Sequence, residues 1–464
     1  MTKKPTRSGN SAANEVHHPS SIHREKLFSL FEEDNGGIIY LRGAELMYRH
    51  QTDYEFPFRQ ESNFWYLSGV NEPDFHLILD LQSRNYHLFM PKRTEQFAVW
   101  HGHIKSSDEV LQKYKPDHLH HDTELPGMLK DLNPDVIYCL NEQQAEYLED
   151  LDRSLQVDTE TLPEAISYCR CIKTDWELDQ LREASRINNI AHLEVLKALR
   201  PGLYEYEAKA IFEYHQIRNG LLQDAYNGIH ASGPNSAILH YVENNRQMKD
   251  GELYLIDAGF EWNGYASDFS RTYPVNGSFD GNQAAIYQTV LEAQKKAIEM
   301  SEPGVRMEEL HLAAARIILE GLREFDLVKG QTEELMENDI FALFFPHGVG
   351  HLLGLDTHDV GGYPKGVDRI DRPGLKFLRT RRELQPGMVI TVEPGLYIIP
   401  ALLKPALEED EKSRYLNRDK IESLFGFGGV RIEDNLIITE NGHENLTDVP
   451  KEIEEIEELA GSSG

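Results

Sequence analysis

Two apolar, β-prone runs, LYLIDAGF and YASDFSRTYPV, are separated by only residues 261–264, and this pattern predicts a β-hairpin. With the turn centred between Trp262 and Asn263, Asp257 and Asp268 become directly opposed on neighbouring strands, so their side chains share one face. Two ionised carboxylates this close repel each other, and one would have to stay protonated. A pair of divalent cations about 3.5–4 Å apart would remove this conflict. Taken alone, the same pair could also be two acids on a solvated hairpin face.

Three further residues of metal-ligand type are scattered along the rest of the chain, each in a motif built for close packing. His351 occurs in PHGVGHLLG, Glu393 in TVEPG and Glu433 in GVRIED. With the two aspartates they give four carboxylates and one neutral imidazole, whose charge two dications would neutralise. A ligand set rich in carboxylates and without thiols suits Mn²⁺, and suits Co²⁺ or Zn²⁺ less well. None of the three cysteines lies near these motifs, which argues against a structural zinc site. The sequence therefore predicts a hydrolytic centre with two divalent metal ions.

Taken in order, IDAG, SDFSRT, HGVGH, LDTHD, VEPG and VRIED resemble the motifs of the metallopeptidase family with the pita-bread fold. That family holds methionine aminopeptidase, aminopeptidase P and the prolidases (Xaa-Pro dipeptidases). Residues 373–458 are most similar to the prolidases, and FWYLSGVNEP and AVWHGHI extend the resemblance toward the amino terminus. The resemblance implies a mixed α/β (α+β) chain. A small N-terminal α/β domain would precede a C-terminal pita-bread catalytic domain with pseudo-two-fold symmetry.

The resemblance also implies roles for individual side chains. Glu393 would be both a metal ligand and the proton shuttle, and its position in VEPG, at a strand end before a Pro-Gly turn, agrees with this; the alternative is a ligand only. The other metal ligands implied are Asp257, Asp268, His351 and Glu433. His240 and His358 would bind the substrate and the tetrahedral intermediate, and Arg379 would bind the substrate carboxylate. Trp100 would contact the neighbouring subunit's site; the alternative is a core tryptophan.

Other histidines and arginines receive different interpretations. His347 and His351 are four residues apart, but the glutamate of the zinc-protease helix motif is missing and glycines intervene, so His347 is expected to support the ligands and not to bind metal. Arg431, two residues before Glu433, is expected to orient the carboxylates. The remaining expectations concern solvated side chains: Arg381 and Arg382 beside Arg379, and a solvated loop with His118, His120 and His121.

The chain has 464 residues and a formal net charge of −31, which disfavours nucleic acid and anionic membranes as partners. The segment MTKKPTRSGNSAANEVHHPS lacks the apolar core of a secretory signal, and no run of 18 apolar residues occurs. An odd number of cysteines favours reduced thiols. These observations predict a cytoplasmic protein, and the resemblance implies a homodimer.

Pattern and composition divide the chain into four parts. Residues 1–20 are polar and are expected to be a disordered tail, and residues 21–167 an α/β domain with strands at FHLILDL, YHLFMP and DVIYCL. A linker is expected at 168–173 and the catalytic domain at 174–460. The capping box Thr174-x-x-Glu177 predicts a long helix to about Leu199, stopped by Pro201. Pro-Gly follows a helix twice, a weak sign of internal duplication.

The predicted reaction is hydrolysis of the Xaa-Pro bond of dipeptides by a metal-bridging hydroxide, with Glu393 moving the proton. Two alternatives remain at this point. An aminopeptidase P would cleave the same bond in longer peptides, and a pita-bread module without catalytic activity would bind peptides or proteins.

Overall fold

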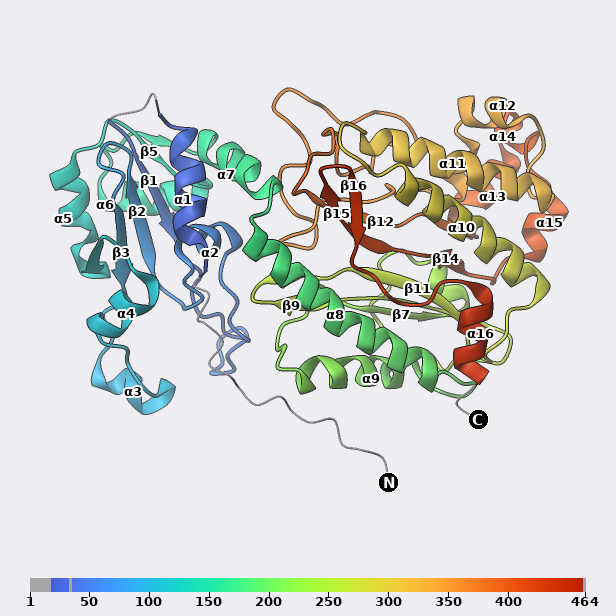
Figure 1. The fold of residues 1–464 in the computed structure, drawn as a ribbon, viewed down its shortest axis with the longest axis horizontal. Coiled ribbons are helices and arrows are strands. Elements are labelled where there is room, and N and C mark those ends of the chain that lie inside the picture. Colours follow the sequence, from blue (N-terminus) through green and yellow to red (C-terminus); the bar gives the residue numbers. More distant parts are fainter. Residues whose placement is uncertain (1–17, 33–35, 462–464) are drawn as a thin grey trace. The chain divides into compact units, whose positions relative to one another are not determined.

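Residues 18–32 and 36–461 are described by a computed structural model (Figure 1). Most of the tail expected at 1–20 therefore lies outside the described residues. The chain divides into two compact units, Met1–Cys169 and Arg170–Gly464. The linker proposed at 168–173 spans this division, and its residues up to Cys171 belong to helix α7 (Thr161–Cys171). Among the described residues, no helix is both long and apolar enough to cross a bilayer.

The described part of the amino-terminal unit is built on one sheet of six strands with mixed pairing. The sheet has the order β4-β3-β2-β1-β5-β6, and the three strands expected from the apolar runs are confirmed as β2, β3 and β5. Its strands are β1 (Ile38–Arg42), β2 (His76–Asp80), β3 (Tyr86–Met90), β4 (His118–His121), β5 (Ile137–Tyr138) and β6 (Val157–Asp158). The helices before α7 are α1 (Ser20–Ser29), α2 (Ser62–Ser68), α3 (Glu95–His101), α4 (Ser107–Tyr114), α5 (Leu125–Leu132) and α6 (Glu142–Leu151).

One face of this sheet packs against helices α5 and α6. Alternate residues of a strand point to the same side, so Ile38 and Tyr40 of β1 lie together with Ile78 of β2. They pack against Leu129 of α5 and Leu148 of α6, and all five side chains are almost fully buried. This core explains why the apolar runs of the sequence become strands of one layered unit.

The expectation of a solvated loop at His118, His120 and His121 is wrong, because these residues form β4 at the sheet edge. His118 pairs directly with His87 of β3, and the two rings stack at 4.7 Å between centroids. His87 Nδ1 also lies 3.2 Å from His120 Nε2 in a hydrogen bond. The polar run gives no strand signal of its own, and pairing with the buried strand β3 imposes the extended conformation.

The second unit begins with the predicted capping box. The Thr174 side chain accepts from the backbone N–H of Glu177, whose carboxylate accepts from the N–H of Thr174, and α8 (Asp175–Ala198) follows, as predicted. Further helices are α9 (Glu205–Arg218), α10 (Gly281–Glu299), α11 (Met307–Glu324), α12 (Thr332–Glu337), α13 (Pro400–Glu408), α14 (Asp410–Ser413), α15 (Arg418–Ser423) and α16 (Ile453–Gly461).

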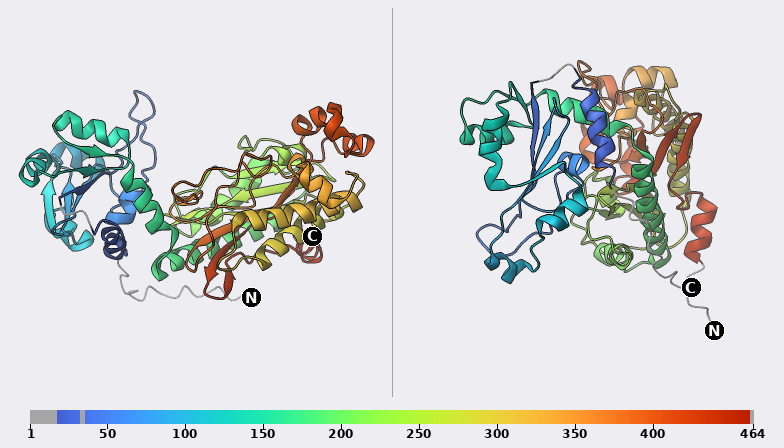
Figure 2. Two further views of the ribbon diagram at one scale, coloured as in Figure 1. Left: turned by 90° about the horizontal axis from the view of Figure 1, so that it is seen from above. Right: turned by 60° about the vertical axis from the view of Figure 1, so that its left-hand side comes forward.

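The strands of this unit form two larger sheets with the orders β11-β8-β7 and β12-β15-β16. The strands are β7 (Ile229–Ser232), β8 (Leu253–Ala258), β9 (Glu261–Trp262), β10 (Tyr265–Ala266), β11 (Phe269–Pro274), β12 (Val389–Val392), β13 (Gly395–Tyr397), β14 (Gly429–Arg431), β15 (Asp434–Thr439) and β16 (Gly442–Asn445). The helix pairs α8–α9 and α10–α11 share one hydrophobic core with both sheets. Figures 1 and 2 show these helices lying along the sheets.

The two halves of this unit repeat the same local structure. After α8 the chain passes through Pro201-Gly202, and after α10 through Pro303-Gly304; each following helix starts three residues after the glycine. Gly202 has φ 90° and Gly304 has φ 91°, a left-handed conformation that glycine adopts without strain. Each glycine N–H donates to a carbonyl of the β-rich segment of its own half, Met248 or Leu384. The mixed α/β fold and the pseudo-two-fold pita-bread architecture are thus confirmed.

Candidate metal centre

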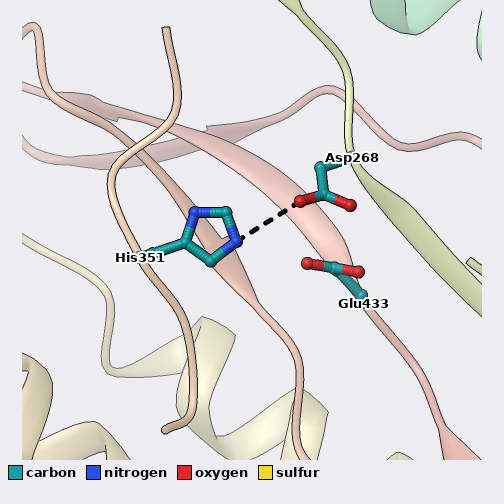
Figure 3. A group of neighbouring side chains, drawn as sticks. All are labelled: Asp268, His351 and Glu433. Atoms are coloured by element: carbon teal, nitrogen blue, oxygen red, sulfur yellow. Dashed lines mark ion pairs between the residues drawn. The ribbon is translucent and has the colours of Figure 1, made fainter. Parts of the chain in front are cut away.

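Three of the five predicted ligands converge where the two halves of the unit meet. Asp268, His351 and Glu433 each offer a ligand atom within 4.8 Å of the others, and all three residues are buried (Figure 3). His351 Nε2 lies 3.3 Å from Asp268 Oδ2. Glu433 is held by a backbone bridge to Ser270 of β11, whose hydroxyl also donates to its carboxylate at 2.7 Å. Residues more than 160 positions apart in the chain therefore share one site.

The predicted direct pairing of Asp257 and Asp268 is wrong by two residues. Trp262 pairs with Tyr265, so the turn is the Asn263-Gly264 pair, with φ of 50° and 84°. Two consecutive residues of positive φ define the two-residue type I′ turn that Asn-Gly favours, and it moves the centre of the hairpin by one residue. Asp257 consequently pairs with Ser270 of β11. Because the register shifts by an even number of residues, Asp268 still lies on the same face as Asp257 and is its diagonal neighbour.

The remaining two predicted ligands lie beside this cluster. Glu393 follows β12, and its Oε1 is 3.7 Å from His351 Nε2. Asp257, on β8, accepts a hydrogen bond from Arg431 Nη2 at 2.6 Å. Arg431 also donates to Ser270 Oγ and Tyr397 Oη, at 2.9 and 2.7 Å, so it links Asp257 to two hydroxyl groups; its role in orienting the carboxylates stays a prediction.

Crowding and burial change the protonation of the two glutamates. Burial raises the pKa of Glu393 to about 7, and the charges of Asp268 and Asp257 add to this effect. Burial, together with Asp268, Glu393 and Asp257, raises the pKa of Glu433 well above its usual value. The cluster therefore binds protons near neutral pH unless cations compensate the carboxylate charge.

The donor set fits a divalent cation. His351 Nδ1 lies 2.9 Å from the Leu352 carbonyl oxygen, to which it donates, and this leaves Nε2 directed at Asp268 and Glu393. A metal-binding histidine is commonly fixed by such a hydrogen bond from its other ring nitrogen. Carboxylate oxygens with one imidazole suit hard or borderline divalent ions.

Two polar residues at this centre escaped the sequence analysis. The phenol oxygen of Tyr226 lies 2.7 Å from Asp257 Oδ1 and 2.6 Å from Asp268 Oδ1. Tyr226 precedes β7 in DAYNGI, which has no recognisable pattern, so only the tertiary structure reveals it. Ser270, in contrast, follows Asp268 by two residues, and the period of a β-strand could have placed it on the same face.

A cavity of about 930 Å³ opens at the carboxylate cluster, and the predicted substrate-binding residues of this unit line its wall. They are His240, His358 and Arg379, all exposed to the cavity or solvent. The ring of His358 packs edge-on against His351, with 4.5 Å between centroids. Desolvation, with the charges of His351 and Arg379, lowers the pKa of His358 to about 3, so this imidazole is neutral at pH 7.

Other predicted residues have different surroundings. His347 Nε2 is hydrogen-bonded to Tyr397 Oη at 2.9 Å, and its Nδ1 lies 3.8 Å from Glu393 Oε2. Trp100 is on α3 of the amino-terminal unit with 76% of its surface exposed, so it is not a core residue of that unit, and its contact with a neighbouring subunit stays a prediction. The expectation of solvated side chains at Arg381 and Arg382 is wrong: Arg381 binds Glu308 and the Asp368 carbonyl, and Arg382 binds a backbone carbonyl.

Fold and site together are those of a metallopeptidase. The model of the metallopeptidase family M24 matches residues 179–440, and that of the aminopeptidase P N-terminal domain matches residues 21–138. The Xaa-Pro dipeptidase of Homo sapiens is 39% identical over 434 residues, which cover 91% of this chain and 88% of the human protein. A probable Xaa-Pro aminopeptidase of Verticillium alfalfae is 37% identical, with 92% and 93% covered.

Solved structures agree with this assignment. The aminopeptidase PepP of Pseudomonas aeruginosa superposes with a TM-score of 0.84 at 33% identity, covering 97% of this chain and 99% of that one. Zinc-substituted Escherichia coli aminopeptidase P in complex with product gives a TM-score of 0.82 at 33% identity, with the same coverage. The chain belongs to the metallopeptidase family M24, and its cofactor is a divalent metal.

The raised pKa values predict how metal affects stability. A carboxyl group whose folded pKa is raised contributes stability below its unfolded pKa and loses it as the pH rises to the folded value. For Glu393 this window runs from 4.5 to about 7, a loss on the order of 3 kcal/mol in metal-free protein. We expect the Tm difference between metal-loaded and chelated protein to widen from pH 5 to pH 8 in calorimetry. A constant difference would show that the carboxylates need no cation.

Proposed function

We propose that this protein is an Xaa-Pro dipeptidase that binds two divalent metal ions, most suitably Mn²⁺. The observation that carries the proposal is the position of the Arg379 guanidinium. It lies on the wall of the cavity beside His358, and among residues 18–32 and 36–461 no hydrogen-bond or ion-pair partner is found for it. An unpaired guanidinium near a hydrolytic centre fits a substrate with a free carboxylate, which a dipeptide presents next to its only peptide bond.

The proposed metal ligands are Asp257, Asp268, His351, Glu393 and Glu433. Bound divalent ions supply Lewis acidity toward the peptide carbonyl and activate water at neutral pH. Five donor residues that include four carboxylates are more than one dication needs for charge balance, which supports the proposal of two ions. The preference for Mn²⁺ rests on the oxygen-rich donor set.

The side chains around this centre have distinct proposed tasks. Glu393 accepts the proton from the attacking water and delivers it to the leaving proline nitrogen, because its carboxylate lines the cavity and lies beside His351. His358 is neutral, so it can donate a hydrogen bond to the oxyanion without carrying a charge of its own. His240 lines the same cavity and is proposed to bind the substrate with it.

Proline in the second position explains the need for such a site. The imide nitrogen before proline carries no hydrogen, so a peptidase cannot hold the bond by that donor. Arg379 would instead hold the carboxylate, and the metal centre the amino-terminal half. The name and 39% identity of the human Xaa-Pro dipeptidase support this substrate class.

An aminopeptidase acting on longer Xaa-Pro peptides is the second candidate. It is supported by the probable Xaa-Pro aminopeptidases at 37% identity and by the aminopeptidase P structures. A cavity of about 930 Å³ also has room for more than two residues. The functions differ in whether a free carboxylate directly after proline is required.

Gly-Pro and Gly-Pro-Gly distinguish the two candidates when they are compared at saturating Mn²⁺. We expect proline release from Gly-Pro and little cleavage of the tripeptide. The Arg379→Ala variant is expected to raise KM for Gly-Pro about 10- to 100-fold, because a charged hydrogen bond to the carboxylate is lost. Equal cleavage of both peptides would instead establish the aminopeptidase.

The matched control is Arg379→Lys, which keeps the positive charge but loses the two parallel N–H donors. It should fall between the wild type and Arg379→Ala. If Arg379→Ala raises KM for Gly-Pro and for Gly-Pro amide equally, the arginine does not recognise the carboxylate.

We further propose a cytoplasmic homodimer in which Trp100 borders the partner's site. This proposal is supported by the sequence resemblance and by the exposure of Trp100. The net charge of −31 disfavours nucleic acid and anionic membranes as partners.

A further inference from the structure

The segment 353–361 carries His358 but has no helix or strand of its own. Its internal backbone hydrogen bonds are few: Gly354 N–H donates to the Asp356 carbonyl at 3.2 Å, and Asp359 N–H reaches back to Leu352 at 2.9 Å. The conformation that presents His358 to the cavity must therefore be imposed by other parts of the unit.

Two cationic side chains from the start of the second unit, Arg170 and Lys173, bind Asp359, the residue that follows His358. The carboxylate of Asp359 accepts from Arg170 Nη2 at 2.5 Å and from Lys173 Nζ at 2.9 Å. The side chains of these three residues are only 1–2% exposed. Arg170 Nη2 also donates to Asp356 at 2.7 Å, so two carboxylates of the segment share one guanidinium.

The segment packs closely around this ionic contact. A Cβ at Gly354 would lie 2.2 Å from Asp359 Oδ2 and 3.0 Å from Lys173 Cε. Lys173 is itself fixed through its backbone N–H, which donates to the Gly387 carbonyl at 2.9 Å. Cys171, between the two cations, has its Sγ 3.5 Å from the Gly361 carbonyl at the end of the segment.

Burial makes this ionic contact selective for one conformation. A buried charge that loses its partner keeps its full desolvation cost, so any shift that separates Asp359 from Lys173 is unfavourable. A satisfied buried network of this kind makes an otherwise irregular segment more rigid. Since Asp359 directly follows His358, fixing the carboxylate also restricts the imidazole that packs against His351.

We propose that Arg170 and Lys173 are positioning residues for His358. They act through Asp359, and hold the imidazole at the place where it meets the substrate. The inference rests on the proposed function, because it assigns His358 a contact with the reacting dipeptide. Neither cation lines the cavity, so neither touches the substrate directly.

A double-mutant cycle of Lys173→Met and His358→Ala on Gly-Pro hydrolysis tests the proposal. Lys173→Met keeps most of the side-chain volume and removes the charge. We expect it to lower kcat about tenfold, with a smaller change in KM, as losses of supporting contacts commonly do. In the His358→Ala background the same change should have almost no further effect, because the residue that it positions is gone.

An equal fold-loss from Lys173→Met in both backgrounds would overturn the proposal, since the lysine would then act independently of His358. Lys197→Met is the matched control: Lys197 pairs with Glu194 on the surface of α8 and should leave kcat unchanged. Lys173→Arg should restore most of the activity.

Should Lys173→Met fail to fold, Asp356→Asn in the same cycle decides the question. Asp356 is 40% exposed, and its replacement keeps the buried Lys173–Asp359 pair but removes the second carboxylate that fixes the guanidinium of Arg170. We expect a loss of about two- to fivefold that disappears with His358→Ala; a loss that persists contradicts the positioning role. A wild-type enzyme inactive on Gly-Pro and Gly-Pro-Gly would overturn the proposed function itself, whereas an active enzyme with independent losses overturns only this inference.

Discussion

Glu433→Gln is expected to abolish metal-dependent activity and yet leave the chelated protein at least as stable as the wild type. Glutamine keeps the volume and can still accept the hydrogen bond from Ser270 Oγ, but it supplies no anionic ligand. In metal-free protein, burial and three neighbouring carboxylates raise the pKa of the wild-type carboxyl group. The folded protein therefore loses stability as the pH rises and this group ionises. Activity assays with added Mn²⁺ and calorimetry at pH 8 with a chelator measure both effects.

The two readouts separate a metal ligand from a core residue. A buried side chain that only packs would lower the Tm of the chelated protein when replaced. The control Glu337→Gln lies on the exposed surface of α12 and should change neither activity nor Tm. Full activity in Glu433→Gln, or a Tm several degrees lower without metal, would contradict the assignment.

Glu393→Gln is expected to lower kcat for Gly-Pro about 10²- to 10⁴-fold, the usual contribution of a positioned proton donor and acceptor. Glutamine keeps the volume of the side chain, but its amide cannot take up and release a proton as a carboxylate does. Single-turnover rates at saturating Mn²⁺ give the loss, and metal analysis of the same sample gives the ion content.

Metal content decides between the two roles proposed for Glu393. Retained metal with a large fall in kcat supports the proton shuttle. If the variant loses a metal ion and its kcat falls as well, Glu393 is a ligand only. A variant with normal kcat removes Glu393 from the mechanism.

Local patterns in the sequence were sufficient for several of the regular elements. The capping box at Thr174 and Glu177 fixed the start of α8, because both partners of the motif lie within one turn. Apolar runs identified β2, β3 and β5, since burial on both faces of a strand leaves little choice of residue type. The repeated Pro-Gly segments indicated the duplication, because each sets the backbone conformation locally.

Errors arose where the decisive partner is distant or where the turn type matters. The hairpin was placed two residues out of register because Asn263-Gly264 forms a two-residue turn. The run from His118 to His121 became a strand because β3 offers it an edge. Arg382 is bound by a backbone carbonyl 21 residues earlier, which no local pattern records.

The sequence by itself determined the chemical types and the order of the five proposed ligand residues, because those types are what hard divalent cations bind. Only the tertiary structure decided which of their oxygen and nitrogen atoms face one another, and it added Tyr226, Ser270 and the Arg170–Lys173 grip on Asp359. Distances between side chains from separate elements depend on strand register and on buried charge pairs. Both are properties of long-range packing, which the order of residues in the chain does not display.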